Sequence, residues 1–211
     1  MAAWELLSLV YQNTPMAYID ETTVMVNNLK TKTWQRSDSA VYSPKNDENL
    51  KSVTVYGCVA HPWIMDRPLL QTGTRTRGEE LIPFLRRILE LRRDGRPDQK
   101  MVLVMDRHSA HFGVPTGVRT FIQNNFRPYY LPTATSELNS AETLFAVMKR
   151  HLKSFFLQYQ ARIRRQELFF QELENGLDEV MEKYTDSRLF FANMRDIHQT
   201  LVEVGELDLE P

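Results

Sequence analysis

The stretch 101-MVLVMDRHSAH-111 decides the fold, because five apolar residues are followed directly by an acid and a polar segment. An uninterrupted apolar run of this length suits a central strand that helices cover on both faces. Other runs, rich in β-branched, aromatic or apolar residues, predict further strands at Met16–Ile19, Thr22–Leu29, Ser52–Val59 and Arg127–Leu131. The first 60 residues are therefore expected to form strands, apart from a polar loop over Lys30–Lys51.

Helical patterns surround the central run. Leucines and isoleucines recur at helical spacing over Glu79–Asp94, and the pattern stops at Gly95 and Pro97. After residue 140 the chain is almost entirely helical, with helices predicted over Ser140–Gln158, Ile163–Tyr184 and Ser187–Val204. Strands followed by strand–helix alternation and then by helices predict an α/β or α+β domain with one mixed sheet.

Composition excludes several classes of protein. The 211 residues are 42% hydrophobic and 25% charged, which supports one sizeable core and excludes a mainly disordered chain. No run approaches the roughly 18 apolar residues of a membrane span. The N-terminus has no basic leader, so we do not expect a secreted protein. We expect the protein in the nucleus if its source is a eukaryote and in the cytoplasm if its source is a bacterium. A single cysteine, Cys58, excludes a disulfide framework and is expected in the core.

Charge is divided unevenly along the chain. Residues 1–165 hold 23 Lys and Arg against 15 Asp and Glu, whereas residues 166–211 hold 3 against 12. The near-neutral total of −1 therefore combines a basic body with an acidic tail. Such asymmetry favours a polyanionic partner for the body, with solvated helix faces as the alternative.

Three acids occupy positions where a site could form. Asp20 ends the apolar run Met16–Ile19, Asp106 ends the run Met101–Met105, and Glu142 lies near the start of a predicted helix. Ligands gather beyond the carboxyl ends of strands in open α/β sheets. Three converging carboxylates repel one another unless a cation joins them. Oxygen ligands of this kind select Mg²⁺ or Mn²⁺, and a pair of such ions commonly serves phosphoryl displacement.

Each acid also has a simpler interpretation. An aspartate after a strand is frequently a turn or cap residue, and a glutamate in a first helical turn is favoured by the helix dipole. Asp20-Glu21 after an apolar run also resembles the acidic motif of phosphate-loop ATPases. That interpretation fails, because no GxxxxGK[ST] motif exists in the chain.

Three ordered blocks resemble the signature motifs of DDE transposases of the mariner-related superfamily. They are YIDET at 18–22, LVMDRHSAH at 103–111 and YYLPTATSELNSAETLFAVMKRHL at 129–152. Thirty-five residues separate Asp106 from Glu142, close to the short spacing typical of that group. Trp34 and Val55-Tyr56-Gly57 fall where the family has a tryptophan and its third strand. The resemblance covers roughly residues 15–160.

The resemblance implies an RNase H-like fold: a mixed central sheet flanked by helices, with Asp20 on the first strand, Asp106 after the fourth and Glu142 on a following helix. It implies that these acids are the catalytic residues and hold two ions of Mg²⁺ or Mn²⁺. The sequence departs from the family at Arg107, usually Asn, and at Thr135 and Ser140, usually Pro. We expect residues 1–160 to form the catalytic domain and residues 161–211 an acidic helical extension packing on it.

Basic residues near the third acid are candidates for nucleic-acid binding. Residues 149–165 hold six Lys and Arg and no acid, and Lys149, Arg150 and Lys153 begin two turns after Glu142. Arg107, His108 and His111, which follow Asp106, are expected to contact substrate or to form loop hydrogen bonds rather than to bind metal. A second arginine cluster has two interpretations, phosphate binding or a solvated face; it comprises Arg75, Arg77, Arg86, Arg87, Arg92, Arg93 and Arg96.

Three functions remain open at this point. The first is a metal-dependent catalytic domain for DNA strand cleavage and strand transfer. The second is a domesticated, non-catalytic descendant that binds nucleic acid or acts as a scaffold in a larger assembly. The third is an RNase H-like nuclease with a different substrate. Only about fifteen residues precede the first predicted strand, so we expect a homo-oligomer or a larger assembly to supply sequence-specific DNA binding. The tail helices are expected to cap the sheet, with an oligomer surface as the alternative.

Overall fold

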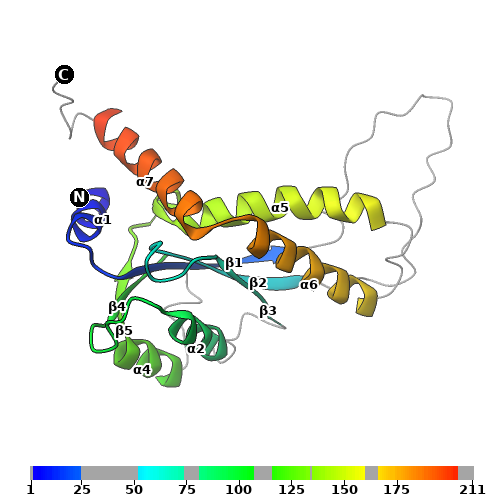
Figure 1. Ribbon diagram of the computed structural model, residues 1–211, viewed down its shortest axis with the longest axis horizontal. Helices are drawn as coiled ribbons and strands as arrows, with labels where there is room; N and C mark the ends of the chain where they lie inside the picture. The colour runs from blue at the N-terminus through cyan, green and yellow to red at the C-terminus, as the bar shows by residue number, and fades with distance from the viewer. Residues whose placement is uncertain are drawn as a thin grey trace.

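A five-stranded mixed sheet forms the centre of the molecule (Figure 1). The computed structural model describes residues 2–24, 52–73, 81–106, 116–133, 135–159 and 166–203. The strands are β1 (Met16–Val24), β2 (Val53–Ala60), β3 (Leu69–Gly73), β4 (Met101–Met105) and β5 (Phe126–Tyr130). Their order in the sheet is β3-β2-β1-β4-β5.

The sheet has an antiparallel half and a parallel half. Strands β1, β2 and β3 pair antiparallel, whereas β4 runs parallel to both β1 and β5. Parallel strands need crossover connections. Strands β2 and β3 and helix α2 lie between β1 and β4 in the chain, and helix α4 lies between β4 and β5. The carboxyl ends of β1, β4 and β5 therefore meet at the same edge of the sheet.

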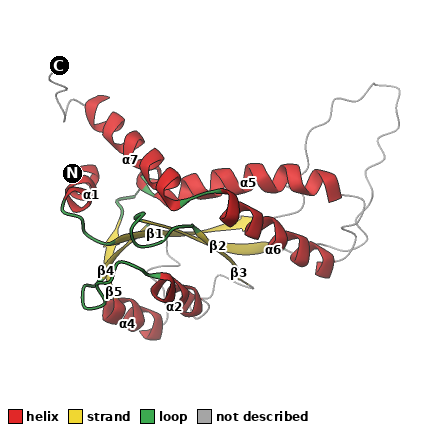
Figure 2. Ribbon diagram, viewed as in Figure 1, coloured by secondary structure: helices red, strands yellow, loops and turns green. Residues whose placement is uncertain are grey.

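Helices cover both faces, as Figure 2 shows. The helices are α1 (Ala2–Tyr11), α2 (Leu81–Leu91), α4 (Thr116–Asn125), α5 (Ser140–Tyr159), α6 (Gln166–Lys183) and α7 (Asp186–Glu203), and a short 3₁₀ helix, η3 (Ser136–Leu138), precedes α5. Helices α2 and α4 cover one face with their own apolar cluster, and α1, α5, α6 and α7 pack on the other. None of the described helices has the length and apolar composition needed to cross a membrane.

Strand alternation divides the core between these two faces. Met16 and Tyr18 of β1 belong to the cluster beneath α5, whereas Ala17 and Ile19 belong to the cluster above α2. All five residues of β4 are buried, which confirms the prediction of a central strand covered on both sides. The expected α/β fold with a mixed sheet flanked by helices, including three helices after residue 140, is confirmed. Cys58 is buried in the core, as expected.

Asp20 was expected at the end of a strand but lies inside one. Strand β1 continues to Val24, and its pairing with β2 is unbroken from Ala17↔Ala60 to Val24↔Val53. Thr22 to Val24 therefore extend β1 instead of opening a second strand, and residues 25–51, including Trp34 and the predicted loop, lie outside the described residues. Val55 to Gly57 lie on β2, the second strand among the described residues.

Three elements differ from the sequence-based expectation. The first residues form helix α1 instead of a strand, because Leu6 and Leu7 bury against the sheet cluster. Strand β3 has only five residues, and its two leucines are adjacent, so it shows no alternating pattern. Helix α4 places only Val118 and Ile122 in the core, a spacing too sparse to identify a helix.

Candidate active site

Two of the three acids lie side by side on the face that carries α5. The parallel register between β1 and β4 pairs Tyr18 with Val104, and its continuation by two residues sets Asp20 beside Asp106. Tyr18 and Val104 both belong to the cluster beneath α5, so side-chain alternation directs Asp20 and Asp106 to the same face. Both acids are half-buried at the edge where the parallel strands end.

The third acid, Glu142, lies in the first turn of α5, and Asn139 fixes where that turn begins. The Asn139 Oδ1 accepts a 3.2 Å hydrogen bond from the Ala141 N–H, and the Asn139 carbonyl accepts one of 3.0 Å from the Glu142 N–H. This is the N-cap arrangement that satisfies the first amides of a helix. Helix α5 therefore presents Glu142 one turn after a buried, capping asparagine.

The same asparagine joins α5 to β1. Its Nδ2 donates a 3.2 Å hydrogen bond to the carbonyl of Ile19 and lies 3.5 Å from Oδ2 of Asp20. Asn139 is 1% exposed, so its bond to Ile19 is shielded from water, whereas its contact with Asp20 is partly buried. The sequence motif Ser-Glu-Leu-Asn contained Asn139, but the residue was not among the predicted site residues. The signal that could have found it is an N-cap residue placed directly before a helix that carries a candidate acid.

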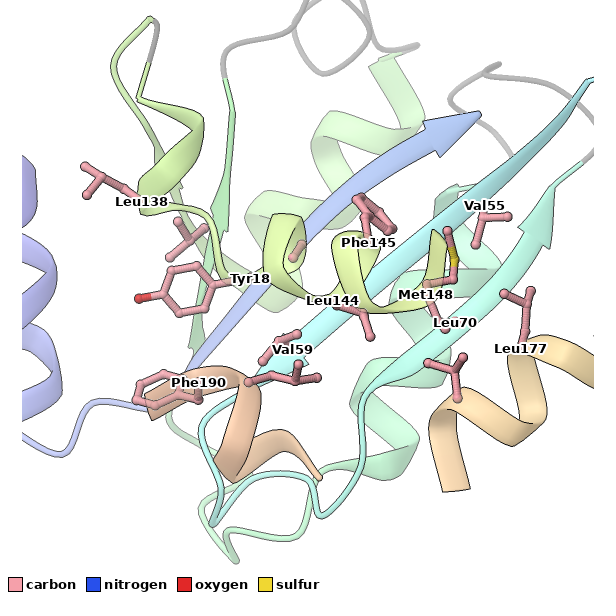
Figure 3. Packing of buried hydrophobic residues seen from close by; sticks show 14 of the residues in the cluster. Tyr18, Val55, Val59, Leu70, Leu138, Leu144, Phe145, Met148, Leu177 and Phe190 are labelled. Atoms are coloured by element: carbon pink, nitrogen blue, oxygen red, sulfur yellow. The ribbon is translucent and has the colours of Figure 1, made fainter. Parts of the chain in front are cut away.

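A glycine on β2 allows α5 to approach the sheet beside Asp20. Gly57 pairs with Asp20 in the β1–β2 ladder, and the ring of Phe145 lies over it. A Cβ atom at Gly57 would lie 2.6 Å from Cε1 of Phe145. Figure 3 shows Phe145 on the side of α5 that faces the sheet, next to Leu144 and Met148. Because Glu142 precedes Phe145 by about one helical turn, this contact also sets the height of Glu142 above the strands.

The three acids interact electrostatically. The pKa of Asp20 is raised to about 7, mainly by burial and also by the nearby charges of Asp106, Glu142 and Glu21, against the lowering effect of a hydrogen bond from the Glu21 N–H. That bond measures 2.8 Å to Oδ1 of Asp20. The sheet edge therefore gathers carboxylates whose joint ionisation is costly, as expected of a site that receives a cation.

The acids are not gathered tightly enough to enclose an ion. Over the ranges that the structure describes, no three His, Cys, Asp or Glu side chains come close enough together to hold a metal. Glu142 is exposed, whereas Asp20 and Asp106 are half-buried. The donor set itself fits Mg²⁺ or Mn²⁺, since all three groups are carboxylates. Ion binding at this edge therefore requires the acidic side chains to draw closer together.

Three cations lie along the exposed side of α5 beyond Glu142. Lys149, Arg150 and Lys153 are all exposed. Lys149 and Lys153 follow Glu142 by seven and eleven residues, so these two lysines lie on the same stripe of the helix as Glu142, with Arg150 next to Lys149. The stripe leads away from the acids over about 16 Å at 1.5 Å per residue. Arg107, His108 and His111, also predicted to contact nucleic acid, lie outside the described residues.

The second arginine cluster makes structural contacts in this fold. Arg86 lies over the ring of Phe121, with its guanidinium carbon 5.7 Å from the ring centroid. The Arg92 guanidinium makes two 2.7 Å hydrogen bonds to the Asp94 carboxylate, and this ion pair is largely buried. Intramolecular partners of the others are Glu90 for Arg87, Asp66 for Arg93 and the Asn13 carbonyl for Arg96. These contacts favour the interpretation of a solvated face with local ion pairs; Arg75 and Arg77 lie outside the described residues.

The acidic tail helices contact the same side of the sheet as α5. Phe169, Leu173 and Leu177 of α6 and Phe190 of α7 share one buried cluster with β1, β2 and α5. At the surface, His151 of α5 lies 2.9 Å from the Glu179 carboxylate of α6. The division of the chain into domains at residue 160 stays a prediction.

Comparison with solved structures confirms the fold. A crystal structure of the Mos1 mariner paired-end complex with Mn has 15% sequence identity and a TM-score of 0.52, and the match covers 94% of this chain and 58% of that one. A pre-cleavage Mos1 transpososome has 14% identity and a TM-score of 0.56, with 99% and 61% of the two chains covered. The chain thus spans about three fifths of the length of these proteins, whose RNase H-like fold it shares.

Sequence comparisons give a more specific result. Comparison with curated proteins finds no match. The sequence profile of the family described as DDE superfamily endonuclease matches residues 15–164, which include Asp20, Asp106 and Glu142. Because this match spans well over half of its length, the chain belongs to the family of DDE superfamily endonucleases.

Proposed function

We propose that this chain is a transposase-type catalytic domain, related to the mariner group, that performs divalent-metal-dependent cleavage and strand transfer of DNA. The observation that carries the proposal is the meeting of three acids from three elements at one sheet edge. Asp20 of β1 and Asp106 after β4 lie side by side, and Glu142 on α5 is close enough to raise the pKa of Asp20. The family match supports the endonuclease class.

In this proposal Asp20, Asp106 and Glu142 hold two ions of Mg²⁺ or Mn²⁺. When bound, the ions would lower the pKa of the attacking oxygen, first water and then a DNA 3′-hydroxyl, and stabilise the leaving oxygen. The chain's own contribution is placement. The β1–β4 register holds the two aspartates together, while the Asn139 cap and the Gly57–Phe145 contact set the position of Glu142. One of the similar Mos1 structures is a complex with Mn, which supports a divalent ion.

Lys149, Arg150 and Lys153 would bind backbone phosphates of DNA on the stripe that leads from Glu142. Contacts to phosphates position a duplex without reading its sequence. We propose the same role for Arg107, His108 and His111, which directly follow Asp106 in the sequence. Sequence-specific binding to DNA ends would then come from a second copy or from another part of the assembly.

A non-catalytic descendant that binds nucleic acid is the second candidate. One observation favours it: within the described residues, no three potential ligands are close enough to hold a metal. The charge repulsion among three acids opposes it, because a protein without catalysis gains nothing from a costly carboxylate cluster.

A strand-cleavage and strand-joining assay distinguishes the two candidates. Labelled DNA duplexes are incubated with the protein and Mg²⁺, Mn²⁺ or chelator, beside Glu142→Gln and the matched control Glu137→Gln, an exposed acid in η3. The catalytic proposal expects ion-dependent nicking or joining that Glu142→Gln abolishes and Glu137→Gln retains. DNA binding without cleavage by the wild type would favour the second candidate. Cleavage confined to an RNA–DNA hybrid would favour an RNase H-like nuclease.

A further inference from the structure

A buried polar network links the C-terminal helix α7 to the start of α5. In the part of the chain that the structure describes, five polar or charged residues are buried, and three of them meet here: Asn139, Ser140 and Asn193, exposed by 1%, 0% and 2%. Buried polar groups are costly unless they are hydrogen-bonded. The network therefore depends on all three residues keeping their partners.

Asn193 holds the start of α5 from the α7 side. Its Nδ2 donates a 2.8 Å hydrogen bond to the carbonyl of Glu137 in η3, and its Oδ1 accepts one of 2.8 Å from the Ser140 hydroxyl. One amide thus fastens both the turn before α5 and the first residue of α5. Both bonds are 2.8 Å long and both side chains are buried, so the geometry of this turn is strongly constrained.

From Ser140 the network continues to the acids. The neighbouring residue Asn139 donates to the Ile19 carbonyl and lies 3.5 Å from the Asp20 carboxylate. Phe190, one turn before Asn193 on α7, packs edge-on against Tyr18 of β1, with ring centroids 6.0 Å apart (Figure 3). Helix α7 therefore contacts β1 directly and also acts on it through the start of α5.

We propose that Asn193 is a positioning residue for the active site: through Ser140 and Asn139 it holds the Glu142-bearing turn of α5 against Asp20. The inference rests on the proposed function, because it assigns a purpose to the position of Glu142. It goes beyond the family match, which ends at residue 164 and does not include α7. Helix α7 is then a working part of the site and not only a cover for the sheet.

The test compares Asn193→Ala and Ser140→Ala with Ile197→Val. Ile197 lies on the same helix and is buried among apolar residues, so its substitution loosens the packing of α7 without removing a hydrogen bond of the network. Each protein is examined in three ways: thermal melting in chelator, Mn²⁺ titration followed by electron paramagnetic resonance, and hydrogen exchange of α5 without metal. Melting in chelator measures how far each substitution destabilises the fold, and the Mn²⁺-binding and exchange results are compared with that loss of stability taken into account.

We expect Asn193→Ala to weaken Mn²⁺ binding by about tenfold, the lower end of the effect of removing an outer partner of a metal ligand. Ser140→Ala should weaken it less, and the double variant should show less than the sum of the two effects, because both act on one contact. Exchange should rise at residues 140–145 and stay unchanged in the middle of α5. Ile197→Val should bind Mn²⁺ as tightly as the wild type once its loss of folding stability is taken into account.

Mn²⁺ binding by Asn193→Ala and Ser140→Ala equal to that of Ile197→Val would overturn the inference. A wild type that binds no Mn²⁺ would instead overturn the proposed function, and the exchange measurement would then decide the inference alone. Increased exchange confined to residues 140–145 would support positioning of this turn by Asn193. An increase spread evenly over α5 would show a role in general stability and overturn it.

Discussion

The ring of Phe145 covers the backbone of Gly57 so closely that a Cβ atom there would lie 2.6 Å from Cε1 of the ring. The contact joins α5 to β2 at the residue paired with Asp20. A side chain at Gly57 would require the ring of Phe145 to move aside or α5 to move away from the sheet. Movement of α5 would carry Glu142 with it, so this contact between two uncharged residues bears on the position of an acid.

Gly57→Ala is expected to destabilise the fold by about 1–3 kcal/mol, the usual cost of an added methyl group in a packed core. The matched control is Gly117→Ala in α4, where a Cβ would meet nothing within 4 Å. In a helix that change is expected to be neutral or to stabilise by up to about 1 kcal/mol. Urea denaturation of both variants measures the difference. Equal stability for the two would show that the ring of Phe145 moves aside at little cost.

Asp20→Asn is expected to stabilise the metal-free protein, and more so as the pH rises from about 4 to about 7. In the unfolded chain this carboxyl ionises near its ordinary pKa of about 3.9. In the folded protein its pKa is raised to about 7. Between about pH 4 and pH 7 the unfolded chain therefore loses this proton while the folded protein keeps it, so the folded protein becomes less stable as the pH rises. The gain at pH 8 should be about 1–4 kcal/mol, at roughly 1.4 kcal/mol per pKa unit.

Denaturation of both proteins with chelator at pH 4, 6 and 8 tests this pH dependence. Asp98→Asn, in the exposed turn before β4, serves as the control and should show no such trend. A gain for Asp20→Asn that is the same at all three values would refute the electrostatic explanation.

Asp106→Asn is expected to leave metal-free stability unchanged or raised, because it removes one of the charges that disfavour ionised Asp20. An ordinary cap residue would instead lose about 1 kcal/mol on substitution. Millimolar Mn²⁺ should raise the melting temperature of the wild type by mass action, and the variant should lose most of that increase. Thermal melts with chelator and with Mn²⁺ measure both effects. Clear destabilisation of the metal-free variant, without any Mn²⁺ effect on the wild type, would make Asp106 a cap residue.

Replacing Lys149, Arg150 and Lys153 by alanine is expected to reduce the salt dependence of DNA binding. Each lost phosphate contact lowers the slope of log K against log salt by about 0.9, so the triple variant should lose about 2–3. The matched control replaces Arg86, Arg87 and Arg93, which have intramolecular partners, and should retain the wild-type slope. Fluorescence anisotropy over a series of salt concentrations gives both slopes. The same slope for both triple variants would show that the α5 stripe is a solvated face and does not bind phosphates.

The sequence predicted the elements whose side-chain pattern reports burial directly. Strand β4 is apolar on both faces and α2 has helical spacing, and both appear where they were expected. Helix α1, β3 and α4 were missed because each contributes only two residues to the core, which is too few to form a recognisable pattern. Asp20 was misplaced within its strand because the polar residues after it are held by pairing with β2, which an apolar pattern does not reveal.

The three acids were predicted as site residues from their motifs, and that assignment stays a prediction, whereas the residues that contact them could not be predicted. Asn139 acts on Ile19 and Asp20 from 120 and 119 residues away, and Asn193 acts on Ser140 from 53 residues away. Hydrogen bonds between such distant residues leave no periodic signal. Gly57 likewise looks like an ordinary residue of a β-rich run until the ring of Phe145 is placed over it.

Anomalous diffraction from crystals soaked in Mn²⁺ tests the central claim most directly, because it locates the ion without relying on activity. The account predicts anomalous density at the sheet edge among the carboxylates of Asp20, Asp106 and Glu142, with the Glu142 side chain drawn toward the two aspartates. It also predicts that the density disappears in crystals of Asp106→Asn. Mn²⁺ bound only elsewhere on the protein, or the same density in Asp106→Asn, would contradict the assignment of these three acids as the metal site.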